Sequence, residues 1–318
     1  MNILILSVGT RVQLVRYFQK SKRITRVVTT DCSKYAPALY EGSRYYIVPR
    51  MDEVKYIPFI FEICEKENID AILPLHEDEL VLMAGLKEQF EAKSICVVIS
   101  PAETIQLCRD KYKLTKYMWE RGIACVPTYV YEFERETIEK IPFPVLVKER
   151  YGAGSSGMLK VNCKELLEAY NKNVESPIVI QPYLEVQEFG VDVYVDMISG
   201  EIINIFIKKK IRMRAGETEK SVSVREPRII DLIKKIISVM KLRGPIDVDI
   251  FLYQNNFILL EINPRFGGGY IHAHQCGVDF IDYIIKNISG KKNVPDIGNY
   301  KAGQVLLKYT DAIMLNEE

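Results

Sequence analysis

Three features that would fix a function class at once are missing from this sequence of 318 residues. No stretch approaches the roughly 18 apolar residues of a membrane-spanning helix. Lysine and arginine number 43 against 42 aspartates and glutamates, a formal net charge of +1. Without a surplus of one sign, neither a nucleic acid nor an anionic membrane surface is an expected partner.

Cysteine offers no structural framework either. The seven cysteines are odd in number and scattered along the chain, and none forms a Cys-x-x-Cys pair. This distribution argues against a disulfide scaffold and against a zinc module. The opening residues 1–6 lack the cationic segment and the long apolar core of a secretory signal. We therefore expect a reduced, cytoplasmic protein.

What the sequence does contain is a regular alternation in its first third. Short apolar runs at 2–7, 26–30, 45–48, 71–75 and 95–99 alternate with stretches of helical spacing. This alternation predicts an α/β fold, a parallel sheet wrapped by helices, with ligands beyond the carboxyl ends of the strands. The length predicts a second domain in addition.

Polar residues stand at those predicted strand ends. The loop around Gly9 lacks the G-x-G-x-x-G spacing of a dinucleotide site, so it is either a tight turn or part of a small-substrate site. In the second case Arg11 would bind a carboxylate, and Glu77, Asp78 and Glu79 an amino group. The same acids also suit a helix N-terminus, whose dipole they complement.

The second half of the chain has an α+β texture, and its strongest chemical signal is a hairpin at 246–262. Glu261 and Asn263 share one face because side chains alternate along a strand, and Asp249 on the other arm reaches the same face. Two carboxylates and an amide oxygen are donors that Mg²⁺ prefers. Asp247 is an alternative first ligand, and Arg265 supplies a cation for a phosphate or an oxyanion. The alternative is a solvated hairpin face, which the apolar flanks disfavour.

A second signal is a lysine before a glycine-rich loop. Lys148 ends a short strand, and the loop after it contains Gly154, Ser155, Ser156 and Gly157. A point charge beside many unhindered backbone N–H groups can grip phosphates without a Walker sequence. The alternative is an ordinary hairpin connector beside an exposed lysine.

In this order the segments resemble the ATP-grasp superfamily, in particular one unit of the carbamoyl phosphate synthetase large subunit. The resemblance covers nearly the whole chain and rests on Asp110-Lys111-Tyr112-Lys113-Leu114, Lys148 with its loop, Gln181-Pro182-Tyr183-Leu184 with Glu188, Asp249, and Glu261-Ile262-Asn263-Pro264-Arg265. It implies a Rossmann-like pre-ATP-grasp domain at 1–108 and a two-lobed α+β ATP-grasp fold at 109–297. The smaller flap lobe would lie at about 115–180, before a C-terminal segment at 298–318.

The resemblance also implies a role for each matching position. The residues that would bind ATP are Lys111 and Lys148 on the phosphates, Gly154, Ser155, Ser156 and Gly157 in the flap loop, Gln181, Tyr183 and Leu184 at the adenine, and Glu188 on the ribose. The residues that would hold two Mg²⁺ ions are Asp249, Glu261 and Asn263, with Mn²⁺ as an alternative metal. Arg265 would stabilise the acyl phosphate and the tetrahedral intermediate.

The function implied is an ATP- and Mg²⁺-dependent ligase that activates a small carboxylate as an acyl phosphate and couples it to an amine, releasing ADP and phosphate, with amino-acid-like substrates. One alternative is phosphorylation of bicarbonate or carbamate with a partner, because the chain holds a single ATP-grasp unit. The other is a nucleotide-binding regulatory protein without turnover. Since many family members are dimers, the resemblance also allows a homodimer.

Two further segments are less specific. The basic stretch at 208–225 is either a solvated loop or, in an ATP-grasp enzyme, a lid over the triphosphate. Arg225 is our predicted catalytic clamp for a substrate carboxylate, because arginine binds carboxylates through two hydrogen bonds. His272 and His274 follow three glycines and are either bases or metal ligands, or ordinary polar residues near a helix start.

Overall fold

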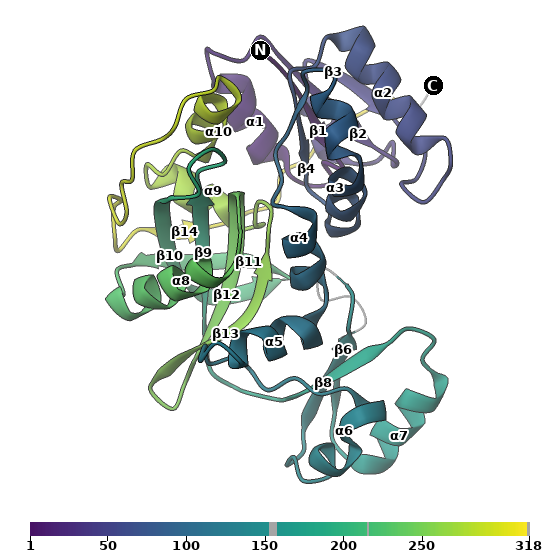
Figure 1. Ribbon diagram of the computed structural model, residues 1–318, viewed down its shortest axis with the longest axis vertical. Helices are drawn as coiled ribbons and strands as arrows, with labels where there is room; N and C mark the ends of the chain where they lie inside the picture. The colour runs from purple at the N-terminus through teal and green to yellow at the C-terminus, as the bar shows by residue number, and fades with distance from the viewer. Residues whose placement is uncertain (153–157, 215, 317–318) are drawn as a thin grey trace.

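The computed structural model describes residues 1–152, 158–214 and 216–316, and within these ranges the strands form three sheets. Figure 1 shows three bodies: the N-terminal one in purple and blue at the top, a larger one mainly in green, and a small one in teal at the bottom. The predicted flap loop with Gly154, Ser155, Ser156 and Gly157 lies outside the described residues.

The N-terminal body contains a parallel sheet, as the alternation of strands and helices predicts. Its strand order is β3-β2-β1-β4-β5, and all neighbouring pairs are parallel. β1 is buried on both faces, which explains its continuous apolar run. The strands are β1 (Asn2–Leu6), β2 (Arg26–Asp31), β3 (Arg44–Ile47), β4 (Ala71–Pro74) and β5 (Cys96–Val97). The helices are α1 (Val12–Lys20), η1 (Pro37–Glu41), α2 (Tyr56–Glu67) and α3 (Glu77–Glu91).

The strand order brings the carboxyl ends of β1, β2 and β4 together. After β1, Gly9 adopts a φ of +49°, a left-handed conformation that favours glycine. Its N–H donates to the Asp31 carboxylate at the end of β2 over 2.9 Å. Gly9 therefore makes a tight turn, and this turn sets the position of Arg11 at the sheet edge.

The largest body is built on an antiparallel sheet of order β13-β12-β9-β10-β11-β14. On one of its faces lies α8, whose Ile229, Ile233 and Ile236 are fully buried. The strands are β9 (Gln187–Val195), β10 (Ile202–Arg214), β11 (Glu217–Val224), β12 (Gly244–Tyr253), β13 (Asn256–Asn263) and β14 (Val305–Leu307). The helices are α8 (Pro227–Val239), α9 (Tyr270–Gln275) and α10 (Phe280–Ile288).

The large sheet and the N-terminal body share one hydrophobic core. On the face opposite α8, Tyr194 and Phe206 belong to a buried cluster that also contains Phe266 and Phe280. The cluster continues into α1, where the Phe18 ring meets the Phe266 ring with a centroid distance of 6.3 Å. This shared core fixes the carboxyl ends of the parallel strands relative to the large sheet.

The small body carries the sheet β7-β6-β8 with two helices. Its elements are α6 (Tyr131–Ile138), β6 (Val145–Glu149), β7 (Leu159–Val161), α7 (Lys164–Asn173) and β8 (Ile178–Pro182). The preceding helices are α4 (Ala102–Arg109) and α5 (Lys111–Trp119), and Leu114 and Met118 of α5 pack with the core of the large sheet. We therefore propose that the flap lobe begins after α5, and the division at residue 108 stays a prediction.

The basic stretch 208–225 is not a solvated loop. It continues β10 and then forms β11, which pair from Ile207 with Val224 to Arg214 with Glu217. Lys208 and Lys210 are buried, whereas Lys209 between them is exposed, as expected for alternating strand positions.

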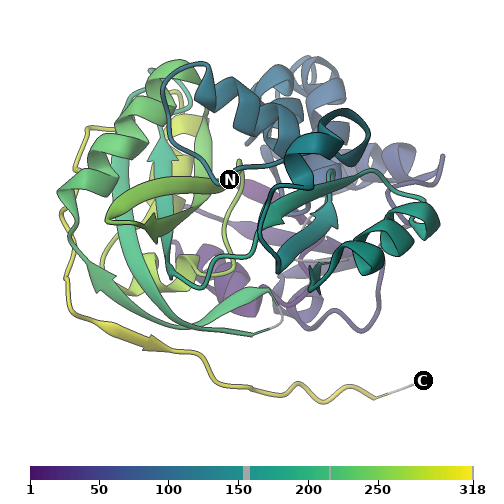
Figure 2. The same cartoon turned by 90° about the horizontal axis from the view of Figure 1, so that it is seen from below.

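Beyond β11 the chain returns late to the same sheet. β14 pairs with the outer edge of β11. The residues after it run in an extended path along the outside of the molecule, as Figure 2 shows in yellow. The start of this C-terminal segment therefore lies beside the tip of the β10–β11 hairpin.

The helices in the described ranges are short. The longest of these, α3, has 15 residues. A span of the hydrocarbon core needs roughly 20. None of the described helices is long and apolar enough to cross a membrane.

One buried ion pair joins α5 to the small body. Asp110 caps α5 by accepting from the Lys113 N–H, and its two oxygens accept from Arg150 over 2.8 and 2.7 Å. Burial alone would raise the pKa of Asp110, but the hydrogen bonds from Arg150 and from the Lys113 N–H outweigh it and lower that pKa. The pair brings the start of α5 against the end of β6.

The first prediction concerns the hairpin formed by β12 and β13. Ile250 is fully buried on β12 next to Asp249. We expect Ile250→Ala to lower the free energy of unfolding by about 2–5 kcal/mol, because it leaves a cavity in the core. Ile211→Ala is the control, since Ile211 is 56 % exposed and its loss should change stability by less than about 0.5 kcal/mol. Equal urea midpoints for both variants would contradict this packing.

The second prediction concerns Arg150→Met, which leaves Asp110 buried without its partner. We expect a loss of about 3 kcal/mol near neutral pH. Because the pKa of Asp110 is lower in the folded protein than the unfolded value of about 3.9, its ion pair stabilises the fold above that pH. The difference in unfolding free energy between Arg150→Met and wild type should therefore shrink as pH falls below about 4. Urea unfolding from pH 7 to pH 3 measures this. Arg135→Met is the control, with a side chain that is 59 % exposed, and a pH-independent loss at Arg150 would refute the coupling.

Candidate active site

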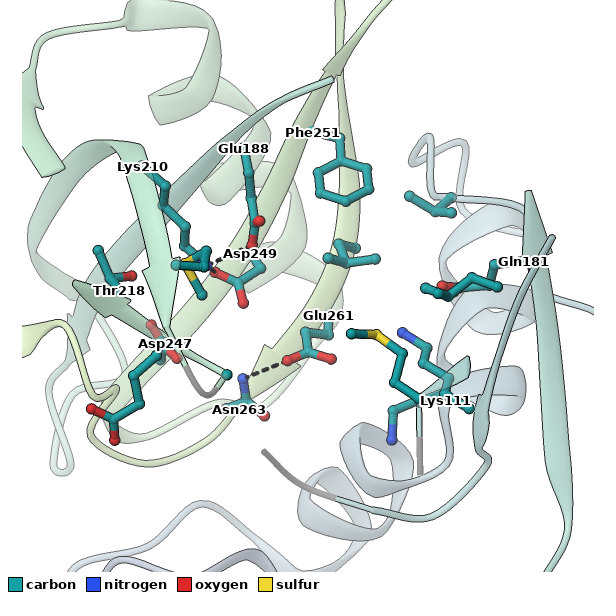
Figure 3. A pocket seen from close by; sticks show the side chains of 18 of the residues that line it. Lys111, Gln181, Glu188, Lys210, Thr218, Asp247, Asp249, Phe251, Glu261 and Asn263 are labelled. Atoms are coloured by element: carbon teal, nitrogen blue, oxygen red, sulfur yellow. Dashed lines mark hydrogen bonds and ion pairs between the residues drawn. The ribbon is translucent and has the colours of Figure 1, made fainter. Parts of the chain in front are cut away.

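The charged motifs of the sequence line one cavity of about 480 Å³ between the small body and the large sheet. Figure 3 shows its two walls: Asp247, Asp249, Glu261 and Asn263 from the large sheet stand across from Lys111 and Gln181. The N-terminal body contributes Arg11 to the lining. The cavity thus gathers side chains from all three bodies.

The acidic wall is the β12–β13 hairpin. In its register Asp249 pairs with Glu261 and Asp247 with Asn263, so the predicted shared face is present. The turn at Gln254 and Asn255 has positive φ at both residues, which matches a two-residue hairpin connection. The Asn263 amide donates to Glu261 over 3.3 Å.

Lysines stand opposite this wall. Lys148 on β6 is 9 % exposed, and within the described ranges its ammonium has no hydrogen bond or ion pair. Burial lowers the pKa of Lys148. Lys111 at the start of α5 donates to the Gly152 carbonyl over 2.6 Å. For Glu261, burial acts to raise the pKa, yet the charges of Lys148 and Lys111 hold it below its ordinary value.

The predicted adenine segment follows β8 along the same cavity. Gln181, Tyr183 and Leu184 all line it. The Gln181 amide is buried and donates to the Thr128 hydroxyl over 2.8 Å, so this side chain anchors the segment. The Tyr183 N–H donates to the Pro144 carbonyl over 3.2 Å.

The position predicted for the first metal ligand already holds an internal cation. The Lys210 ammonium lies 2.6 Å from both Asp249 and Glu188. Burial raises the pKa of Asp249 against the pull of Lys210, while the two carboxylates raise the pKa of Lys210 against burial. Sequence reasoning missed this group because it lies in the basic stretch, although its alternation with Lys209 is the signal of a strand.

Arg265 lines the cavity and is held from two sides. It donates to Glu77 of α3 over 3.0 Å, and its other nitrogen lies 3.7 Å from Asp247. It also donates to the Phe266 carbonyl over 3.0 Å. The N-terminal body thereby orients a residue of the predicted catalytic set.

The acids after β4 do not form the predicted amino-group site. Glu77 is engaged by Arg265, and Asp78 pairs with Arg109 over 2.6 Å. Glu79 is fully buried and accepts from the Ser7 hydroxyl over 3.0 Å and from the Tyr56 hydroxyl. A substrate amino group would therefore have to bind an acid other than these three.

Three further predicted residues lie away from the cavity. Arg225 is not among its lining residues, because β11 ends there and the guanidinium donates to the Tyr300 carbonyl over 3.1 Å. His272 sits in α9 and bonds the Ser221 hydroxyl and the Gln304 carbonyl. His274 stacks on Tyr17 with a centroid distance of 3.7 Å. Both histidines therefore match the second interpretation from the sequence, ordinary polar residues near a helix start.

The donor set fits a hard cation that keeps other ligands. In the parts of the chain that the structure describes, no three His, Cys, Asp or Glu side chains are arranged to hold a metal by themselves. Glu261, Asn263 and Asp249 offer carboxylate and amide oxygens on one face. Mg²⁺ suits such a site because it commonly takes one or two carboxylates and completes its shell with water and phosphate oxygens.

Models of known protein families match both halves of the chain. The family model for the PylC-like N-terminal domain matches residues 3–98, and the model for the ATP-grasp domain matches residues 108–269. The arginine-specific carbamoyl phosphate synthase large chain of Halalkalibacterium halodurans is 23 % identical over 250 residues, which is 73 % of this chain and 23 % of the relative. The carbamoyl phosphate synthase large chain of Caldanaerobacter subterraneus is 25 % identical over 282 residues, 82 % of this chain and 25 % of the relative. This chain therefore spans about a quarter of these relatives.

Solved structures show the same fold at low identity. N5-carboxyaminoimidazole synthetase from Staphylococcus aureus, complexed with ADP, has a TM-score of 0.74 at 20 % identity, covering 93 % of this chain and 79 % of that one. Biotin carboxylase from Campylobacter jejuni has a TM-score of 0.73 at 18 % identity, covering 95 % and 74 %. The ATP-grasp model alone matches slightly more than half of the sequence. The predicted resemblance and fold class are confirmed, and the chain belongs to the ATP-grasp family.

Proposed function

We propose that this protein is an ATP- and Mg²⁺-dependent ligase that activates a small carboxylate as an acyl phosphate and joins it to an amine. The observation that carries the proposal is one cavity in which Glu261 and Asn263 face the ammonium groups of the buried Lys148 and the half-buried Lys111. A triphosphate with its metal has the complementary charge pattern, because its anionic oxygens suit the lysines and its cation suits the acids.

The nucleotide would lie along β8. Lys111 and Lys148 would contact its phosphates, with Gly154, Ser155, Ser156 and Gly157 proposed as the flap above them. Because the Tyr183 N–H is already bonded and the Gln181 amide is an anchor, we assign the base edge to the backbone carbonyls and to the Leu184 amide. Glu188 would accept the ribose hydroxyls, a role that suits an acceptor-only group.

The metal would be held by Glu261 and Asn263, with Asp249 as the third donor. When bound, it supplies positive charge at the β- and γ-phosphate oxygens. Lys210 neutralises Asp249 in the arrangement described, so full coordination by Asp249 requires the ammonium to turn toward Glu188. Mn²⁺ has the same oxygen preference and is the expected substitute.

The reaction needs charge placement more than a nucleophilic side chain. One carboxylate oxygen attacks the γ-phosphorus, ADP leaves, and an acyl phosphate forms. The amine nitrogen then attacks the carbonyl carbon, the C–O bond to phosphate breaks with its electron pair, and phosphate leaves. Arg265 lines the cavity and would stabilise the oxyanion of the tetrahedral intermediate.

Two parts of the proposal, the competing reaction and the oligomeric state, do not follow from membership of the family. Because the chain spans only about a quarter of the carbamoyl phosphate synthase relatives, bicarbonate phosphorylation with a partner is the competing reaction. A homodimer is the assembly we propose. The biotin carboxylase domain of Hydrogenobacter thermophilus 2-oxoglutarate carboxylase, with a TM-score of 0.74, is described as a dimer.

The third prediction is that Glu261→Gln lowers ATP-dependent phosphate release by at least about 100-fold, because it removes a charge that the metal requires. Release is measured with panels of carboxylates, amines and bicarbonate over a Mg²⁺ titration. Glu103→Gln is the control, since that side chain is 70 % exposed on α4 and should keep wild-type rates.

Each outcome of this experiment has a meaning. Phosphate release that requires both a carboxylate and an amine supports the ligase. Release with bicarbonate alone supports the competing reaction. Tight binding of Mg·ATP by the wild-type protein with no release across the panel would make it a regulatory protein, and an active Glu261→Gln would refute the metal assignment.

A further inference from the structure

One arginine that lines the cavity lacks a matched partner. Arg11 follows β1 at the sheet edge, and its side chain is 21 % exposed. Within the described ranges its one ion pair is with Glu217, at 3.8 Å between Nε and Oε1, too long for a hydrogen bond. Arg265 nearby is satisfied by Glu77 and the Phe266 carbonyl, whereas the donors of Arg11 remain available.

Arg11 reaches the cavity from a different part of the chain than Lys148, because it follows β1 in the N-terminal body whereas Lys148 lies on β6 of the small body. The charges that act on Arg11 are Arg265, Glu217 and Asp247, and burial together with Arg265 lowers its pKa. The charges that act on Glu261 are instead Lys148, Lys111 and Arg265. Arg11 and Glu217 therefore bring a charged pair from the N-terminal body and the large sheet into the cavity that also holds Arg265.

The acid beside Arg11 is held in place from outside. Glu217, the first residue of β11, accepts from Lys308 over 3.0 Å, and Lys308 also donates to the Gly268 carbonyl over 2.8 Å. A Cβ added to Gly268 would lie 2.7 Å from the Glu217 carboxyl carbon, so the glycine admits the carboxylate. One Glu217 oxygen is thus anchored, and the other faces Arg11 across a gap.

We propose that Arg11 and Glu217 form a recognition site for the amine substrate, and that this substrate is an α-amino acid in its zwitterionic form. This inference rests on the proposed function. Arg11 would bind the α-carboxylate through its free donors, and Glu217 would accept from the α-ammonium group. A simple amine lacks the first group and a simple acid lacks the second, so the pair selects a molecule that carries both.

The coupling step then balances for an ammonium substrate. The ammonium loses one proton to solvent, its nitrogen forms the amide bond and gives a second proton to the leaving phosphate, and the C–O bond to phosphate breaks with its electron pair. The products are the amide, hydrogen phosphate carrying one proton, and one proton released to solvent. The charges of Arg11 and Lys308 hold the pKa of Glu217 low against burial, so Glu217 stays a carboxylate that accepts a hydrogen bond from the ammonium group, and the first proton goes to solvent.

The test compares Arg11→Met and Arg11→Lys with the wild-type protein. Thermal unfolding in Mg·ADP is followed with each protein L-α-amino acid and its D-enantiomer, the matching amides and the matching decarboxylated amines. We expect at least one amino acid to raise the unfolding temperature, with its amide and its amine giving no comparable shift. In phosphate release, Arg11→Met should raise the KM for that amino acid roughly 100-fold, with partial rescue by Arg11→Lys.

The control is Arg16→Met on the same helix, because Arg16 pairs with Glu41 at the surface and should behave as wild type. Glu217→Gln should weaken the binding of the same amino acid and leave the affinity for Mg·ATP unchanged. No shift by any amino acid, equal shifts by amides and amines, or an unchanged KM in Arg11→Met would overturn the inference. Failure of the wild-type protein to bind Mg·ATP would instead refute the proposed function. The failure of this inference and the failure of the proposed function are therefore distinguishable.

Discussion

The arrangement depends on a half-buried acid and a buried lysine that face each other across the cavity without forming an ion pair. Glu261 on β13 and Lys148 on β6 are held by different sheets, and in the described ranges neither completes an ion pair. Burying unpaired charge is costly, so a fold keeps it where a ligand supplies the missing counter-charges. The hydrophobic cores beneath the two sheets maintain this separation, since Val147 and Ile262 next to these residues are buried.

A second set of ion pairs joins the three bodies around that gap. Glu77 reaches Arg265 from the N-terminal body, Arg150 reaches Asp110 from the small one, and Lys308 reaches Glu217 from the C-terminal segment. Two of these pairs place the cavity residues Arg265 and Glu217, and the third holds Asp110 next to the cavity residue Lys111, each by means of a partner distant in sequence. The site is therefore a property of the assembled chain, and none of the bodies contains it alone.

Much of the fold and of the site could be predicted from local sequence patterns. Strand alternation was sufficient to place Glu261 and Asn263 on one face, and the strand–helix alternation was sufficient for the parallel sheet. The prediction from sequence failed where the partner of a side chain depends on packing between strands. Lys210 looked like part of a solvated charge run, yet β10 places it between Glu188 and Asp249, 22 and 39 residues away. Arg225 failed for the same reason, because the end of β11 directs it to Tyr300.

The most direct test of the central claim is calorimetric titration of a non-hydrolysable ATP analogue into the wild-type protein and Lys148→Met, with and without Mg²⁺. The account predicts one nucleotide site per chain, tighter with Mg²⁺ and weakened at least about 100-fold by loss of the buried ammonium. Binding that is indifferent to both Mg²⁺ and Lys148 would show that the facing charges do not form the nucleotide site.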